Sequence, residues 1–163
     1  MKLKSKKSAS IFLAVFFIAG MCAWLVNWHM KKEPAINNDC SAFLAMHKKA
    51  YDFSAKLSVY INMHSNNTGY LDMSGTINSH GVEYTTARAW NFAYQMQNGN
   101  ILHLTDITTH KRAADNTPDD VIDKLIFSTT SGSSRYVKIT ALNNAWVISN
   151  LYSPMFICVI NTP

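Results

Sequence analysis

The chain has 163 residues, of which 48% are hydrophobic and 15% are charged, and its formal net charge is +5. Four lysines lie within the first seven residues, and from Lys31 onward the remaining basic residues nearly balance the 10 acidic ones. A nucleic-acid-binding domain normally shows a basic patch or stripe. The near-neutral remainder excludes that class of protein on charge pattern, although the net charge at first suggests it.

The first thirty residues predict a membrane anchor. Residues 1–7, MKLKSKK, hold the four lysines, and residues 8–30 contain no Lys, Arg, Asp or Glu. As a helix with a rise of 1.5 Å per residue, about 20 apolar residues span about 30 Å, which is the thickness of a bilayer core. The more basic flank of a membrane helix stays in the cytoplasm. We therefore expect a cytoplasmic segment over 1–7 and a single transmembrane helix over 8–30 in a bacterial inner membrane, with the rest of the chain in the periplasm.

Two other fates of this segment are a cleaved signal peptide and a lipoprotein. A signal peptide has an apolar region of about 7–15 residues and a small-x-small cleavage site, whereas here the apolar run continues through Val26 without such a site. The stretch IAGMC ends in Cys22, but Met21 occupies the position where lipidation needs a small residue. We therefore predict an uncleaved signal anchor with Cys22 inside it.

Two further cysteines, Cys40 and Cys158, lie near the two ends of the exported part. An even pair in an oxidising compartment predicts a disulfide. In the chain-entropy model, a bridge that closes so long a loop contributes about 4–5 kcal/mol of stability. The alternative is two buried thiols that never meet.

After a short linker, residues 31–39, the sequence predicts a β-rich periplasmic domain over 40–163. Apolar and polar residues alternate, most clearly in KLSVYINMH, where Leu57, Val59 and Ile61 share one face. The same alternation predicts strands at 40–47, 56–64, 70–77, 82–94, 101–107, 135–141, 145–150 and 155–161. Turn signals such as NSHG and QNGN separate these segments.

One segment has helical spacing. TPDDVIDKLIFS, residues 117–128, predicts a short amphipathic helix with Thr117 as its N-cap and Pro118 at its first helical position. The expected class is α+β and mainly β: a curved antiparallel sheet or a small lipocalin-like barrel with one short helix. A bond between Cys40 and Cys158 would bring the first and last strands together, which favours closure.

The candidate functional residues are aromatic. Within the predicted strand 82–94, alternation places four large rings on one face: Tyr84, Trp90, Phe92 and Tyr94. They can form the core of the barrel. They can also form the wall of an apolar ligand cavity, or a patch that docks on a protein partner.

The sequence contains no recognisable catalytic or metal-binding arrangement. The histidines have neither the spacing of helical metal ligands nor cysteine partners at zinc-finger spacing. Neither a nucleophile elbow nor a phosphate-binding glycine loop is present. We therefore expect no enzymatic activity, no metal site and no cofactor, and an envelope enzyme is the least favoured hypothesis.

The whole layout resembles a known family. The lysine-rich start, one membrane helix, the early Cys40, the alternating strands and the late MFICVIN with Cys158 are similar to the FidL-like membrane proteins of enteric bacteria. Members of that family are often encoded beside ToxR-like, membrane-bound transcription regulators. In related ToxR/ToxS-type pairs, the small partner protects the periplasmic domain of the regulator, and some pairs complete a lipocalin-like barrel for bile salts.

Two functions remain open. The resemblance implies an accessory or effector protein that stabilises or modulates a ToxR-like regulator through that regulator's periplasmic domain. The alternative is a stand-alone periplasmic module that binds a bile salt or a lipid. In both cases the expected contacts are the lipid bilayer, a protein partner or an apolar ligand, without direct contact with nucleic acid.

Overall fold

A computed structural model describes residues 38–97, 99–126 and 134–161, together with residues 17, 18, 20–22 and 24. The chain divides into two compact units, Met1–Pro34 and Ala35–Pro163. None of the helices in the described part of the chain combines the length and apolar character needed to cross a bilayer. Most of the expected transmembrane helix, 8–30, lies outside the described residues, so this helix, its orientation and the domain bounds stay predictions.

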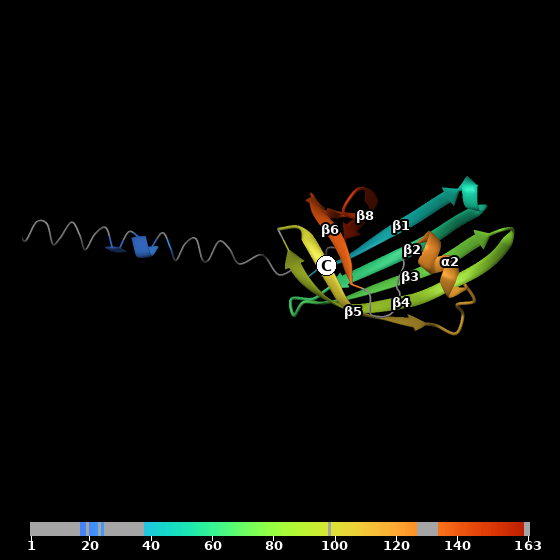
Figure 1. The fold of residues 1–163 in the computed structure, drawn as a ribbon, viewed down its shortest axis with the longest axis horizontal. Helices are drawn as coiled ribbons and strands as arrows, with labels where there is room; N and C mark the ends of the chain where they lie inside the picture. The colour runs from blue at the N-terminus through green and yellow to red at the C-terminus, as the bar shows by residue number, and fades with distance from the viewer. Residues whose placement is uncertain are drawn as a thin grey trace, which may run out of the picture. The chain divides into compact units, whose positions relative to one another are not determined.

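The second unit is an antiparallel β-barrel (Figure 1). Each strand pairs with its neighbours in sequence, and β1 also pairs with β8, so the sheet closes on itself. The strands are β1 (Asn38–Lys48), β2 (Phe53–Met63), β3 (Thr68–Ser79), β4 (Val82–Gln97), β5 (Ile101–Lys111), β6 (Arg135–Leu142), β7 (Ala145–Ser149) and β8 (Pro154–Ile160). The prediction of a mainly β fold is therefore confirmed, and of the two expected arrangements the closed barrel is the one formed.

The inward faces of the strands form one hydrophobic core, as the alternation in the sequence predicts. Leu57, Val59 and Ile61 on β2 are all buried, while their polar neighbours point outward. On β1, Cys40 is buried, whereas Phe43 on the opposite face is 69% exposed. Because side chains alternate across a strand, each strand gives half of its residues to the core. The unit Ala35–Pro163 contains the barrel, its core and its disulfide, and so has what a domain needs to fold alone.

The predicted helix is present but begins later and ends earlier than expected. α2 spans Asp119–Leu125, with Pro118 rather than Thr117 at the N-cap position. Thr117 is instead fully buried, and its side-chain oxygen bonds with the hydroxyl of Thr86 at 2.6 Å. The hydroxyl of Thr117 therefore bonds with a residue of β4 and does not cap the helix as the sequence predicted. One further helical turn, the 3-10 helix Lys49–Tyr51, connects β1 to β2.

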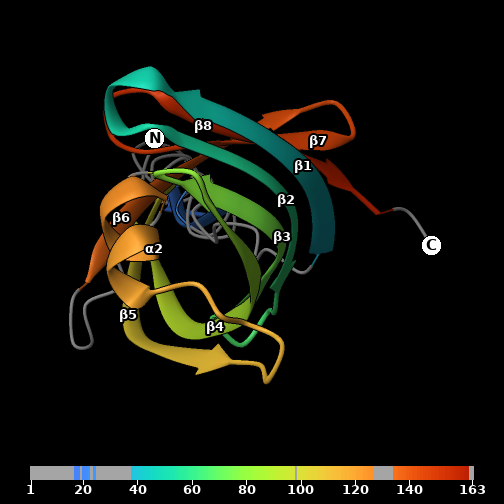
Figure 2. The same cartoon turned by 90° about the vertical axis from the view of Figure 1, so that its right-hand side faces the viewer.

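The strands of the barrel differ in length, and this shapes its two ends. β1 to β5 have 11 to 16 residues each, whereas β6 to β8 have five to eight. β6 pairs with β5 only along the segment that begins at Ile101 and ends at Leu104. At one end, therefore, the long strands extend beyond the short ones, and α2 lies near the end that faces the viewer in Figure 2.

The seam between the first and last strands carries the predicted disulfide. Cys40 and Cys158 are bonded, with their Cα atoms 5.4 Å apart. Backbone pairing between β1 and β8 covers Cys40↔Ile160 and Ser41↔Val159. The prediction of the bridge is confirmed, and the alternative of two separate thiols is wrong.

Candidate functional site

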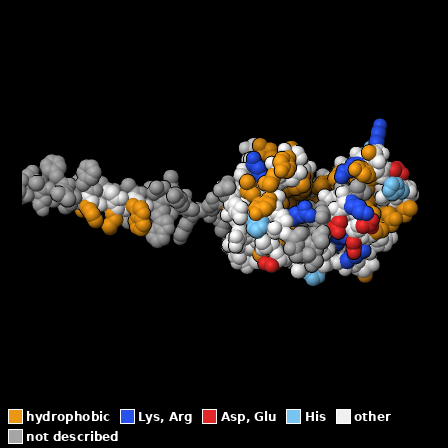
Figure 3. Space-filling model, in the orientation of Figure 1, with side chains coloured by type: hydrophobic (Ala, Val, Ile, Leu, Met, Phe, Trp, Pro, Cys, Tyr) orange, Lys and Arg blue, Asp and Glu red, His pale blue; other side chains and the backbone are white. Residues whose placement is uncertain are grey.

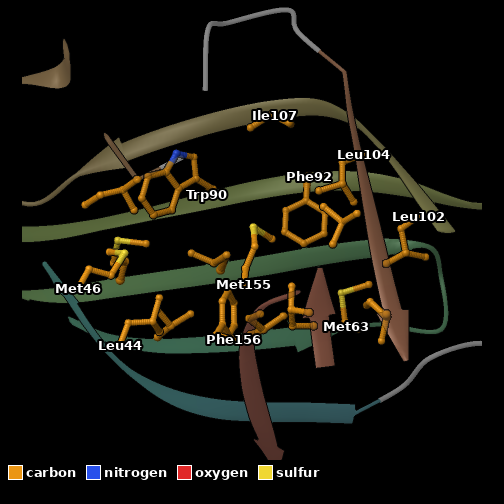
Figure 4. A pocket seen from close by; sticks show the side chains of 18 of the residues that line it. Leu44, Met46, Met63, Trp90, Phe92, Leu102, Leu104, Ile107, Met155 and Phe156 are labelled. Carbon is orange, nitrogen blue, oxygen red and sulfur yellow. The ribbon is translucent and has the colours of Figure 1, made fainter. Parts of the chain in front are cut away.

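The interior of the barrel contains an apolar cavity of about 420 Å³. Figure 4 shows side chains from several strands converging on this space. Its lining is shared among all eight strands, the loop between β7 and β8 and the end of α2: Leu44, Met46, Lys48, Val59, Ile61, Met63, Leu71, Met73, Trp90, Phe92, Leu102, Leu104, Ile107, Ile126, Val137, Ile139, Ile148, Ser153, Met155 and Phe156. All but Lys48 and Ser153 are hydrophobic, so the space favours an apolar occupant.

Four of the lining residues are methionines: Met46, Met63, Met73 and Met155. The thioether chain is unbranched, flexible and polarizable, so it adapts to surfaces of different shape. Met63 and Met73 are nearly fully buried, and Met155 is 41% exposed. The wall of the cavity is therefore able to adjust to its occupant, both deep inside and at the surface.

The structure brings only two of the four predicted aromatic residues to this cavity. Trp90 and Phe92 line it, as one of the sequence interpretations expects. Tyr94 is buried elsewhere in the core, where its hydroxyl donates a hydrogen bond to the carbonyl oxygen of His64 at 2.7 Å. Burial raises the pKa of the Tyr94 hydroxyl. Tyr84 is partly buried and packs against the core without lining the cavity.

Phe92 owes its place to a glycine on the neighbouring strand. Gly69 on β3 lies directly opposite Phe92 on β4. A Cβ atom on Gly69 would lie 2.3 Å from Cε2 of the ring. The ring therefore covers the bare backbone of the glycine, an arrangement known from other sheets in which an aromatic residue shields a glycine.

A β-bulge on β5 turns another apolar residue into the cavity. The pairing of β4 and β5 shifts between Asn91 and Ala93, opposite Asp106, which has a φ of 52°. A bulge inserts one residue and changes which side chains face inward. Inward positions on β5 therefore run Leu102 and Leu104 and then Ile107, so all three line the cavity. Strict alternation would instead place Asp106 on the inward face.

A buried ionic network holds α2 against β4. Arg88 points inward from β4 and is 2% exposed. Its Nε and Nη2 atoms each donate to Asp115, both at 2.8 Å, and Nη1 donates to Asp119 at 3.0 Å. Nη2 also donates to the carbonyl oxygen of Thr117 at 2.8 Å. The network fixes the start of α2, whose Ile122 is fully buried in the core.

The carboxylate of Asp115 is held in its charged form by these contacts. Burial by itself raises the pKa of Asp115, but hydrogen bonds from Arg88 and from the backbone N–H groups of Ala87 and Thr117 outweigh it. The result is a pKa below the ordinary value of an aspartate. The role of this network is to position α2, whose last turn is followed by the cavity-lining Ile126.

The exposed lining residues mark where the cavity meets solvent. Ser153 lies in the loop just before β8, Met155 is the second residue of β8, and both are exposed. Lys48 is the last residue of β1, and Ser153 lies in the loop between β7 and β8. The two polar lining residues therefore come from the end of one strand and from a loop, while all the other described strand positions in the lining are apolar. Figure 3 shows hydrophobic side chains around a recess on the face in view, with basic side chains beside it.

Metal ligands do not gather in the described part of the chain. Over residues 38–97, 99–126 and 134–161, no three His, Cys, Asp or Glu side chains come close enough to hold an ion. His103 instead stacks on Tyr136, with ring centroids 4.7 Å apart. The lining of the cavity supplies burial and shape rather than ligands for a cation.

The buried network and Lys48 are the features that sequence reasoning missed. Thr86 and Arg88 share the inward face of β4 with Trp90. Their spacing of two residues from one another and from Trp90 is the feature of the sequence that could have predicted their burial. Lys48 follows Leu44 and Met46 on the inward face of β1. In each case the face could be read from the sequence, but the partner across the barrel could not.

Comparison with known proteins agrees with the layout of the chain. A family model described as "FidL-like putative membrane protein" matches residues 75–158, just over half of the chain. Neither the comparison with curated proteins nor the comparison with solved structures found a match. The matched segment begins at Gly75 in β3 and ends at the disulfide-bonded Cys158 in β8, so it includes α2 and the buried network. The chain belongs to the FidL-like family.

Proposed function

We propose that the barrel binds an apolar or amphipathic ligand, such as a bile salt or a lipid, in its interior cavity. The observation that carries this proposal is the cavity of about 420 Å³ with a nearly continuous apolar lining. Ligand sites in proteins commonly have volumes of about 300–1,000 Å³ and few polar groups. Each Å² of apolar surface that a ligand removes from water contributes about 25 cal/mol to binding.

Displacement of an apolar fluorescent dye from residues 35–163 tests this proposal. Bile salts and fatty acids should compete with the dye, because all of them would occupy the same cavity. Leu104→Trp adds bulk to the lining and should abolish dye binding. Leu142→Trp is the matched control, because Leu142 is 49% exposed and does not line the cavity. Circular dichroism of both variants establishes that the barrel still forms.

Two results would reject the ligand-binding function. One is a failure of every bile salt and fatty acid to displace the dye from the unmodified domain. The other is equal dye binding by the Leu104→Trp and Leu142→Trp variants, which would place the dye outside the cavity.

A second candidate is an accessory role beside a ToxR-like, membrane-bound transcription regulator. Membership in the FidL-like family supports it, together with an apolar outer surface at the seam of the barrel. Val159 lies opposite Ser41 in the register and is 48% exposed, and Ile157 and Phe43 continue the same outer face. Exposed apolar patches of this kind often mark protein contacts. A ligand could modulate such a pair only by binding its two states with different affinity.

Co-purification from membranes in mild detergent tests the accessory role. The full chain should retain a ToxR-like regulator encoded beside it, and a Phe43→Ser/Ile157→Ser double variant should lose that regulator. Tyr152→Ser is the control, since Tyr152 is 95% exposed and lies outside the two seam strands. Recovery of the unmodified chain without the regulator would argue against a stable pair, whatever the result of the dye assay.

A further inference from the structure

The described lining of the cavity is almost entirely apolar and contains a single charged side chain. Eighteen of its 20 described residues are hydrophobic, and the two polar ones are Lys48 and Ser153. The hydroxyl of Ser153 is uncharged and donates a hydrogen bond to Oδ1 of Asn150 at 3.4 Å within its own turn. Lys48 is therefore the one charged side chain among the described residues of the lining.

The position of Lys48 suits contact with both the cavity and the solvent. It is the last residue of β1, follows the inward-facing Leu44 and Met46, and is partly buried. Its Nζ atom lies 6.0 Å from the ring centroid of Phe53, the buried residue opposite it on β2. The aliphatic stem of a lysine can cover apolar surface while its ammonium group stays near water. The charge is thus held at the border between the apolar lining and the solvent.

The sign of this charge selects the ligand. The described lining of the cavity contains this one cation and no carboxylate. An anionic headgroup at the border is attracted by an ammonium group, and a cationic one is repelled.

We propose that Lys48 receives the anionic headgroup of an amphiphile whose apolar body fills the cavity. The proposal rests on the ligand-binding function and names its substrate class: single-charge anionic amphiphiles, with a carboxylate or a similar group at one end. The apolar body supplies most of the affinity by burial. Lys48 supplies orientation and discrimination between headgroups.

A headgroup series with a constant tail tests this assignment. Dodecanoate, dodecanol and dodecylamine are titrated against residues 35–163 below their micelle concentrations, with dye displacement as the readout. Dodecanoate should bind most tightly, because only its headgroup matches the ammonium group. Lys48→Gln should weaken dodecanoate binding about tenfold and leave dodecanol unchanged, as expected for one charge-assisted hydrogen bond. Lys48→Arg should retain the preference for dodecanoate.

Lys49→Gln is the matched control. It removes the same charge one residue later, on an exposed position that does not line the cavity, so the preference for dodecanoate should persist. Cholate in a parallel titration distinguishes a rigid ring body from an acyl chain, and preferential binding of either anion supports the class.

The outcomes separate this inference from the ligand-binding function. Binding of none of the three compounds would reject the ligand-binding function, and the role of Lys48 with it. Equal binding of all three would leave ligand binding standing and overturn the selection of anions. A preference for dodecanoate that survives Lys48→Gln, or disappears equally in Lys49→Gln, would overturn the assignment to Lys48.

Discussion

At the scale of single residues, the most consequential feature is the charged pair inside the barrel. Arg88 and Asp115 have side chains that are 2% and 0% exposed. Removing two charges from water is costly, and only close pairing with further hydrogen bonds offsets this. Asp115 meets that requirement, since it also accepts bonds from the backbone N–H groups of Ala87 and Thr117 at 2.9 and 3.0 Å.

We expect Asp115→Asn to destabilise the barrel strongly. The substitution leaves Arg88 buried without its main counter-charge, and losing one partner of a buried pair typically reduces stability by about 3–5 kcal/mol. The unfolded pKa of an aspartate is about 3.9. Because the folded pKa of Asp115 lies lower, its stabilising contribution is full above that value and is lost as pH falls through the folded pKa. Urea unfolding at several pH values should therefore show a shallower acid limb in the variant.

The exposed pair on α2 provides the control for this experiment. Lys124 and Asp120 lie 3.3 Å apart, with side chains that are 73% and 64% exposed. Such pairs contribute about 0.3–0.5 kcal/mol. Lys124→Gln should therefore leave both the free energy of unfolding and its pH dependence nearly unchanged. If Asp115→Asn behaves like Lys124→Gln, the buried pair does not stabilise the barrel.

At the scale of the elements, glycines decide how closely the strands approach. Gly75 on β3 lies opposite Leu57 on β2 and has a φ of 151°. A Cβ atom here would lie 2.1 Å from the carbonyl oxygen of Lys56. Since that neighbour is backbone, no side-chain movement can relieve the contact. A glycine within a strand often marks such a close approach.

We expect Gly75→Ala to lower the free energy of unfolding by at least about 3 kcal/mol, because it combines backbone strain with a clash against β2. Gly81→Ala is the matched comparison. Gly81 has a φ of 75° in the β3–β4 turn, but a Cβ there meets no atom within 4 Å, so only strain of about 1–2 kcal/mol applies. Chemical denaturation of the two variants measures the difference. Equal losses would show that the close approach of β2 and β3 has little energetic weight.

The sequence predicted each of the strands, but not all of their details. Alternation located β2 and β4 and assigned their inward faces, because burial of one face is a local pattern. It missed the change of phase at Asp106, where a bulge depends on the pairing of β4 with β5. The N-cap of α2 was wrong for a similar reason, since Thr117 bonds with Thr86 across the barrel.

At the scale of the whole molecule, closure of the barrel depends on a short seam. β1 and β8 pair over Cys40↔Ile160 and Ser41↔Val159, and the disulfide covalently joins the same two strands. The two cysteines are 118 residues apart, so the bridge encloses nearly the whole barrel. A bridge across so long a loop restricts the unfolded chain strongly.

We expect loss of this bridge to affect both stability and binding. Cys158→Ser or reduction of residues 35–163 should lower the free energy of unfolding by about 4–5 kcal/mol in the chain-entropy model. Because the seam lies beside the cavity wall, affinity for the apolar dye should fall as well. Non-reducing gels should show a mobility shift on reduction that both Cys40→Ser and Cys158→Ser abolish. An oxidised domain with two free thiols, or no change in stability on reduction, would contradict the role of the seam.

The sequence by itself determined the β-rich class, the strands with their inward faces, the cysteine pair and the likeness to the FidL-like family. These follow from local periodicity and from composition, which a linear chain displays directly. Only the tertiary structure decided that the sheet closes, that Trp90 and Phe92 line a cavity while Tyr94 does not, and that Arg88 finds Asp115. Those outcomes depend on strand register and unequal strand lengths, which bring together residues far apart along the chain.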